Sequence, residues 1–205
     1  MPTGYLGLVT NLAPSVPSEP TRMTVERYLG LVEAGVLSHD DRVELLEGVI
    51  VAMTPSHPPH AAAVGLVTRA LMLALGDRAA IRTQCTLVLP PWSAPEPDVA
   101  VVAGSHHDYA TAHPRTALLV VEVADSSLHQ DRLSKAAIYA AAGIPEYWIV
   151  NLRAGVVEVM RDADREHARY RDVRTCAIDE RISLVAISEA GVSVTHLLPA
   201  RPRRA

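Results

Sequence analysis

The chain has 205 residues, a net charge of −4 at pH 7 and an apolar fraction of 49%. A chain of this length and composition can bury enough surface for one globular domain, which excludes a disordered protein and a small disulfide-stapled one. The acidic charge argues against tight, general binding of nucleic acid by a monomer, but it is compatible with a local basic groove or a dimer.

The cysteines and the apolar stretches indicate the compartment. Cys85 and Cys176 fit neither a CxxC spacing nor a zinc ligand set, and we interpret them as buried free thiols of a reducing cytosol. The N-terminus lacks the basic and apolar regions of a signal peptide. Gly, Pro or charged residues interrupt each apolar stretch before about 18 residues. The sequence therefore predicts a soluble, cytoplasmic protein without a membrane span.

The N-terminal quarter predicts an arm, a helix and a hairpin. Residues 1–22 are rich in proline and lack periodicity, which is typical of a flexible arm. Thr24 is a suitable N-cap for an amphipathic helix that ends at Gly35. The segment 42–53 consists of two strand-like runs around Glu47-Gly48, which predicts a β-hairpin.

The middle of the chain predicts one helix followed by three strands. The segment 60–75 is apolar on nearly all faces and is followed by Gly76, which predicts a buried helix. The next runs, rich in Val and Leu, predict strands covered on both faces. These strands lie at 81–89, 98–102 and 118–123, with a proline-rich loop at 90–97.

The remaining segments complete an α/β pattern with a mixed sheet flanked by helices. They are a helix at 128–142 closed by Gly143, strands at 146–151 and 156–160, an exposed hairpin or loop at 161–174, and a final segment at 182–198. No internal repeat is apparent. We therefore expect one domain at 23–198 between the arm (1–22) and a basic tail (199–205).

Two acidic residues fall within apolar strand segments. Asp98 opens the run DVAVV, and Glu122 lies within LLVVEV. A buried carboxylate is unfavourable unless it is paired, hydrogen-bonded or bound to a metal. Two of them on adjacent strands repel each other, and a hard divalent cation relieves that repulsion. The pattern therefore predicts that Asp98 and Glu122 bind Mg²⁺, or Mn²⁺ in its place, for phosphodiester hydrolysis.

Lys135 is the third candidate. On the predicted helix, Asp131, Lys135 and Tyr139 share one face at spacing i, i+4, i+8, and an ammonium there could stabilise charge on a phosphate. The alternative is an ordinary surface pair of Asp131 and Lys135. We expect the opposite face to pack on the sheet. That face carries Leu133, Ala136, Ala137, Ala140 and Ala141.

The sequence leaves the roles of three other residues open. Glu44 lies in the strand-like run VELL, where a structural and a functional role fit the sequence equally well. Glu47 stands in a Glu-Gly turn, which is a common surface motif. His60 lies at the start of a helix, where most histidines are solvated, so the sequence does not decide its role.

Four segments carry a family resemblance. They are RVELLEGVIVAMTPSHPPH (42–60), PEPDVAVV (95–102), LLVVEVADSSLHQDRLSKAAIYAAAGIPEYWIV (118–150) and VVEVMR (156–161). With them, the chain from about residue 24 to 198 resembles the Uma-type putative restriction endonucleases, a bacterial branch of the PD-(D/E)XK nuclease superfamily.

The resemblance implies a restriction-endonuclease-like core of order αβββαβ, to which an N-terminal helix and hairpin are added. It implies that Asp98 ends the proline-aspartate pair of the motif and that Glu122 is its second acid. Ala124 stands where the superfamily has its lysine, and Lys135 on the next helix is the position that matches in this branch. Glu44 matches the upstream acid of the family's E-L-x-x-G segment.

Together these observations predict a Mg²⁺-dependent endonuclease that acts on DNA, with Asp98 and Glu122 as metal ligands. Glu44 would be a further ligand or a water-orienting base, and Lys135 would assist the nucleophile or the transition state. We expect a homodimer or a higher homo-oligomer, because paired sites can cut both strands. Two alternatives stay open: a silent nuclease-like module that binds nucleic acid or a partner, and cleavage of a non-nucleic phosphodiester.

Overall fold

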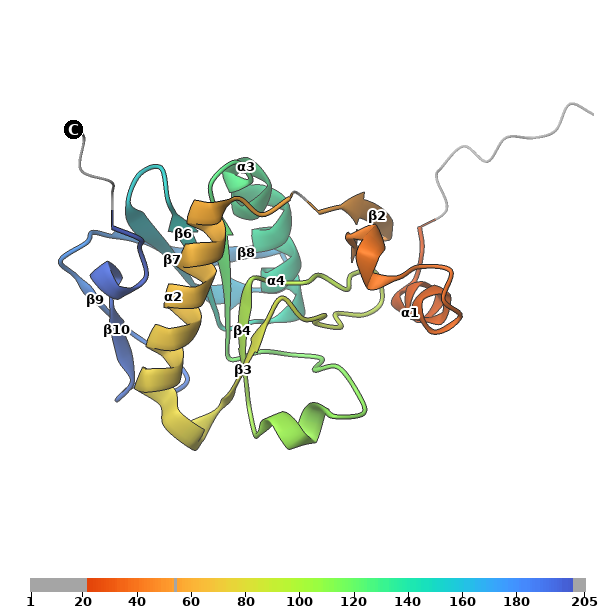
Figure 1. Cartoon of the computed structure of the whole chain (residues 1–205), viewed down its shortest axis with the longest axis horizontal. Helices are drawn as coiled ribbons and strands as arrows, with labels where there is room; N and C mark the ends of the chain where they lie inside the picture. Colours follow the sequence, from red (N-terminus) through yellow and green to blue (C-terminus); the bar gives the residue numbers. More distant parts are fainter. Residues whose placement is uncertain (1–21, 54, 201–205) are drawn as a thin grey trace, which may run out of the picture.

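A six-stranded mixed sheet forms the centre of the molecule (Figure 1), as the sequence predicts. The computed structural model describes residues 22–53 and 55–200. The predicted arm and basic tail therefore lie outside the described residues, apart from Arg22 and residues 199–200. In sheet order, the strands are β3 (Ala80–Thr83), β4 (Val99–Val102), β5 (Leu119–Ala124), β6 (Glu146–Asn151), β7 (Val156–Asp164) and β8 (Arg169–Cys176).

The order of elements confirms the predicted αβββαβ core. Helix α2 (Pro58–Leu75) is followed by β3, β4 and β5, which pair antiparallel to one another. β5 and β6 are parallel, and a parallel pair needs a crossover connection. That crossover is a single helical segment. It consists of α3 (Leu128–Gln130), a π-helical turn η4 (Asp131–Lys135) and α4 (Ala136–Ala142), and Gly143 ends it with a positive φ of 77°.

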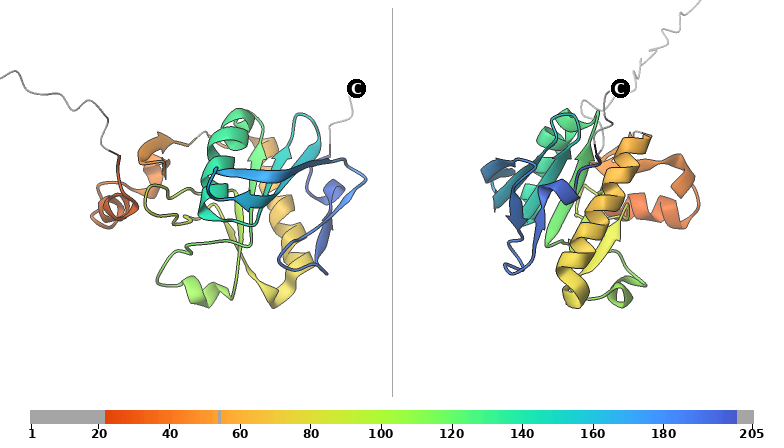
Figure 2. Two further views of the ribbon diagram at one scale, coloured as in Figure 1. Left: turned by 180° about the vertical axis from the view of Figure 1, so that it is seen from behind. Right: turned by 60° about the vertical axis from the view of Figure 1, so that its left-hand side comes forward.

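The sheet separates two apolar cores, because successive strand residues point to opposite faces. On β5, Val121 and Val123 pack beneath α2, whereas Val120 and Ala124 pack beneath α4. Figure 2 shows α2 and the α3–α4 segment on opposite sides of the sheet. Because Glu122 alternates with Val121 and Val123, its side chain lies on the α4 side.

Helix α2 is less buried than its composition predicts. Val67 and Leu71 are fully buried against the sheet, but Met72 and Leu73 are 56% and 77% exposed. The prediction of burial on all sides is wrong, because only one face of the helix meets the sheet. The segment from Pro58 to Arg78 is also long and apolar enough to cross a membrane by length and composition, which for a single helix is weak evidence.

The predicted strand at 81–89 is wrong beyond Thr83. Gln84 has a positive φ of 49°, so the backbone turns away from β4 at this point. The apolar residues that follow are buried without forming a ladder strand: Leu87 donates to the carbonyl of Pro95, and Leu89 bridges to Ser93. Their apolar character reflects burial in a loop rather than a strand.

The predicted N-terminal helix and hairpin are both present, outside the main sheet. Helix α1 (Val25–Glu33) begins after Thr24, whose hydroxyl accepts from the amide of Arg27. Strands β1 (Val43–Leu46) and β2 (Val49–Ala52) form the hairpin, preceded by the short turn η1 (His39–Asp41). The hairpin docks on the 89–94 loop, because the amide of Gly48 donates to Trp92 O and that of Ala94 to Leu45 O.

The C-terminal part adds two hairpins. The segment predicted as an exposed hairpin or loop forms the ends of β7 and β8, and β7 extends four residues beyond the predicted strand because its residues pair with β8 up to Asp164. The second hairpin consists of β9 (Arg181–Ser183) and β10 (Gly191–Ser193), followed by η5 (Val194–His196). The remaining turns are η2 (Gly76–Arg78) and η3 (His106–Tyr109). Both cysteines are free, Cys176 buried and Cys85 only half-buried.

Candidate active site

Asp98 and Glu122 lie next to each other at one end of the neighbouring strands β4 and β5, as predicted. Asp98 immediately precedes β4, and Glu122 lies in β5, the neighbouring strand. The amide of Val123 donates to Oδ2 of Asp98 at 2.8 Å, and the amide of Asp98 approaches Oε2 of Glu122 at 3.4 Å. Both side chains therefore lie on the α4 face, and each touches the backbone beside the other.

Lys135 lies close to two of the three acids that the family resemblance identifies, Glu122 and Glu44. Its Nζ lies 3.0 Å from Oε1 of Glu122 and 3.4 Å from Oε1 of Glu44. Lys135 is therefore not the surface partner of Asp131, which was the alternative interpretation. A lysine ammonium has three N–H donors, and among the described residues only these two carboxylates lie within reach of it. One donor is free for a ligand.

The helix that carries Lys135 packs only partly with the predicted face, of which Ala136 and Ala140 are buried in the core. Asp131, Lys135 and Tyr139 are buried, whereas Leu133 is 59% exposed and Ala141 is also exposed. The polar residues point inward because they meet the acids at the strand ends. The π-helical turn η4 lies at this point, and such turns are frequent at functional sites. Arg132 fixes the turn to β7 through two hydrogen bonds to Glu158.

Glu44 and Glu47 lie in different places although they are three residues apart. Glu44 is buried, and its second oxygen accepts from the amide of Glu96 at 3.1 Å, so both of its oxygens are engaged. Glu47 is exposed at the hairpin turn, near Ser93 and 3.9 Å from Arg22. Only Glu44 belongs to the acidic cluster.

Three further residues join the site. His60, whose role the sequence left open, places Nε2 3.2 Å from Oδ2 of Asp98. Tyr139 donates its hydroxyl to Oε1 of Glu122 at 2.8 Å. Asp131 is buried and accepts from the hydroxyl of Ser127 at 2.6 Å. The shared helix face of Asp131, Lys135 and Tyr139 was the signal in the sequence, whereas for His60 the sequence held none beyond its position at a helix start.

Burial and mutual repulsion dominate the electrostatics of the site. Burial raises the pKa of Glu122 to about 8, against the opposing effect of Lys135, and the neighbouring Asp98 raises it further. Burial likewise raises the pKa of Asp131. Burial alone would lower the pKa of Lys135, but Glu122 and Glu44 raise it above its ordinary value, so the ammonium stays charged. The site therefore combines a lysine ammonium that stays charged with two buried carboxyl groups, Glu122 and Asp131, whose ionisation is unfavourable.

These groups line a pocket of about 80 Å³ between the hairpin, the strand ends and η4. Within residues 22–53 and 55–200, no three His, Cys, Asp or Glu side chains are placed to hold a metal by themselves. Mg²⁺, however, is usually bound by one or two carboxylates together with water and substrate phosphate. Oδ1 of Asp98 accepts no hydrogen bond from the described residues, and Oε2 of Glu122 has only the long contact to the Asp98 amide. The donor set fits Mg²⁺.

Comparisons with known proteins identify the family and the fold of the chain. The family model Uma2, described as "Putative restriction endonuclease", matches residues 25–197. Among solved structures, a crystal structure of a putative nuclease belonging to DUF820 from Anabaena variabilis ATCC 29413 superposes with a TM-score of 0.68 and 15% identity. The match covers 85% of this chain and 97% of that one, and it shows a shared fold. No curated protein matches the chain.

Proposed function

Because the chain belongs to the Uma2 family of putative restriction endonucleases, we propose that it is a Mg²⁺-dependent nuclease that hydrolyses phosphodiester bonds in DNA. The observation that carries the proposal is the convergence of Asp98, Glu122 and Lys135 in one open pocket. A lysine beside two acids at strand ends is the arrangement that the family resemblance implies, and here the lysine comes from the crossover helix.

In this proposal, Asp98 and Glu122 hold the cation through the oxygens that accept little or nothing from the protein. When bound, the cation neutralises phosphate charge and acidifies water for attack on phosphorus. The remaining roles belong to neighbouring side chains that act on the phosphate or position the two acids.

Lys135 is the residue that we expect to contact the substrate. Its free N–H donor points into a site where negative charge increases during phosphoryl transfer, and a fixed ammonium in a poorly solvated pocket stabilises that charge. Glu44 forms an ion pair with Lys135 at 3.4 Å and thereby fixes its position. Since both oxygens of Glu44 are engaged, this positioning role suits it better than metal binding.

His60 and Tyr139 orient the two acids. His60 contacts Oδ2 of Asp98, which leaves Oδ1 available, and Tyr139 occupies Oε1 of Glu122, which leaves Oε2 available. Each acid therefore has one oxygen fixed by the protein and one for a ligand. Partners of this kind are as important for a metal site as its ligands are.

The test is cleavage of plasmid and single-stranded DNA with Mg²⁺ or Mn²⁺. Asp98→Ala and Glu122→Ala should abolish metal-dependent cleavage, and Lys135→Ala should lower the rate about 100-fold or more at saturating metal. Asp77→Ala, which removes an exposed acid on η2, serves as the matched control and should cleave normally. Thermal melts should show that all variants fold.

Equal residual cleavage in the wild type and in Asp98→Ala would identify a contaminant and overturn the proposal. The acidic net charge of −4 favours the second candidate, a nuclease-like module that binds without turnover. Calorimetric binding of Mg²⁺ that depends on Glu122, in the absence of any cleavage, would support that candidate instead.

A further inference from the structure

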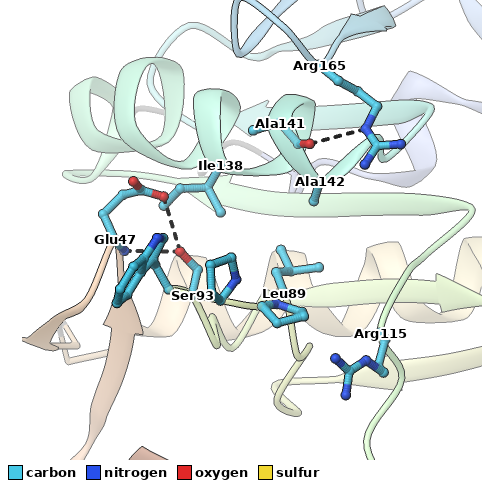
Figure 3. Close-up of a pocket in the computed structure, with 11 residues that line it drawn as sticks. Glu47, Leu89, Ser93, Arg115, Ile138, Ala141, Ala142 and Arg165 are labelled. Carbon is cyan, nitrogen blue, oxygen red and sulfur yellow. Dashed lines mark hydrogen bonds between the residues drawn. The ribbon is translucent and has the colours of Figure 1, made fainter. Parts of the chain in front are cut away.

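A second and larger hollow lies beside the acidic pocket. It has a volume of about 450 Å³ and is bounded by the hairpin turn at Glu47, the loop 89–93, the end of α4 and two arginines (Figure 3). In Figure 3, the side chains of Leu89 and Ala142 face each other across the opening, and Ser93 is hydrogen-bonded to Glu47 at one end of it. None of its lining residues belongs to the acidic pocket, so this cleft has no role in the proposed chemistry.

The charge of the cleft favours an anion. Arg115 and Arg165 line it, and both are exposed. In the part of the chain that the structure describes, neither arginine has a carboxylate within ion-pair distance, and Arg165 contacts only the carbonyl of Ala141, at 3.4 Å. The single acid of the lining, Glu47, is accompanied by Arg22 at 3.9 Å. The cleft therefore carries positive charge on a molecule that is acidic overall.

The cleft also offers a flat apolar surface. Trp92 is half-buried and lines it together with Pro90, Pro91 and Leu89. Because Trp92 is only half-buried, part of its indole ring is accessible, and an aromatic ring of this kind can stack on a base. Guanidinium groups beside such a ring supply phosphate contacts, so the cleft combines both kinds of contact that a nucleotide makes.

The crossover helix and the hairpin contribute different residues to both hollows. On the crossover helix, Lys135, Ile138 and Ala142 follow at i, i+3, i+7 and so lie along one face. Lys135 points to the acids, whereas Ile138 and Ala142 line the cleft. Seven residues of helix span about 10 Å, so the cleft lies about 10 Å from Lys135 along this helix. On the hairpin, Glu44 lines the acidic pocket and Glu47 lines the cleft.

We propose that this cleft is a binding subsite for single-stranded nucleic acid, about 10 Å from the phosphate that is cut. Arg115 and Arg165 bind the backbone phosphates, and Trp92 stacks on a base. The inference rests on the proposed nuclease function and specifies its substrate: a strand that is locally unpaired, since a base within a duplex cannot reach the indole ring.

The test is binding of a labelled single strand of about twelve nucleotides in the presence of EDTA, measured by anisotropy. Arg115→Ala and Arg165→Ala should each weaken binding about fivefold or more and lower the salt dependence by about one counterion. Trp92→Ala should weaken binding about fivefold or more. Arg69→Ala, an exposed arginine on α2 at the other side of the sheet, is the matched control and should leave binding unchanged.

Tryptophan fluorescence gives an independent readout, because the chain has two tryptophans and Trp148 is fully buried. The single strand should quench the emission of Trp92, and Trp92→Phe should abolish the quenching. Equal weakening by Arg69→Ala and Arg115→Ala would overturn the inference, as would tighter binding of duplex without quenching.

Failure of this inference differs from failure of the proposed function. If all cleft variants bind and cut like the wild type while Asp98→Ala is inactive, the nuclease proposal stands and the cleft assignment is wrong. If the wild type neither binds nor cuts any nucleic acid, both are wrong.

Discussion

Glu122 and Glu146 occupy neighbouring strands and look alike in the sequence, yet their surroundings differ. Each lies in a strand of six buried residues, and they are 3% and 0% exposed. Both oxygens of Glu146 accept hydrogen bonds of 3.0 Å or less: Arg161 and the Trp148 indole donate to Oε1, and the amide of Val185 donates to Oε2. Glu122 has a lysine and a phenol on one oxygen and a single long contact on the other.

The difference separates a structural carboxylate from a candidate ligand. Glu146 accepts short hydrogen bonds on both oxygens, and its partners fix β7 and the segment after β9 to the centre of the sheet. Glu122 lines a pocket together with Asp98 and Asp131, where burial raises its pKa to about 8. A buried acid therefore indicates function when its partners leave an oxygen open and other acids stand beside it.

The largest expected effect is on stability at Glu146. Glu146→Gln removes the charge that pairs with Arg161 and should lower the free energy of unfolding by about 3 kcal/mol, because it leaves a partly buried guanidinium unpaired. Glu122→Gln at pH 6 should change it by less than about 1 kcal/mol, since a carboxyl of pKa about 8 is already protonated there. Urea denaturation of the metal-free proteins measures both.

A similar loss of unfolding free energy in both variants would show that Glu122 and Glu146 have the same structural role. The rate of DNA cleavage should distinguish the two acids further. Folded Glu146→Gln should cleave at the wild-type rate, and Glu122→Gln should not cleave.

The next effect is the pH dependence of Mg²⁺ binding. Below a pKa of about 8, Glu122 holds a proton that must leave before the cation binds, so affinity should rise about tenfold per pH unit from pH 6 to 8 and then level off. Calorimetry in two buffers of different ionisation enthalpy should detect the released proton. Glu146→Gln should retain this dependence, and a flat affinity profile in the wild type would contradict the assignment of Glu122.

The raised pKa also predicts the stability of the metal-free protein. Between about pH 4.5 and 8, the folded state keeps a proton on Glu122 that the unfolded chain has released. The contribution of this group is therefore present at low pH and is lost as the pH rises through that window.

The smallest effect concerns the neighbours of the acids. His60→Ala removes the contact to Oδ2 of Asp98 and should weaken Mg²⁺ binding about tenfold, because Asp98 then has one less group that orients it. His57→Ala is the matched control, since His57 is exposed and its side chain makes no cap hydrogen bond. Equal affinities for both variants would show that His60 does not position Asp98.

The order of the core elements could be predicted from the sequence because hydrophobic periodicity reports burial directly. Val120, Val121 and Val123 around Glu122 indicate a strand covered on both faces, and the structure has such a strand. The same signal fails where burial occurs without pairing, as in the loop at Leu87 and Leu89. Composition cannot distinguish the two cases, because hydrogen bonding rather than burial separates them.

The candidate site was only partly predictable for a related reason. Asp98, Glu122 and Lys135 stand out because charge in apolar surroundings is rare. Their partner His60 comes from a distant part of the chain, and only the packing of α2 brings it to Asp98. The inward face of the crossover helix was predicted only in part. Ala136 and Ala140 are buried as expected, but a rule that places apolar residues inside does not account for the buried Asp131 and Lys135, because the interior there is a polar site.

The attachment of the hairpin to the loop at 89–94 has one more consequence. Glu44 belongs to that hairpin, which is not a strand of the central sheet, and yet it contacts Lys135. If the hairpin detached, Asp98 and Glu122 would stay next to each other on the central sheet. Lys135 would lose its contact with Glu44 and keep the one with Glu122. The orientation of the ammonium is thus coupled to an element outside the central sheet, so in the proposed nuclease a change in the position of the hairpin would alter the site.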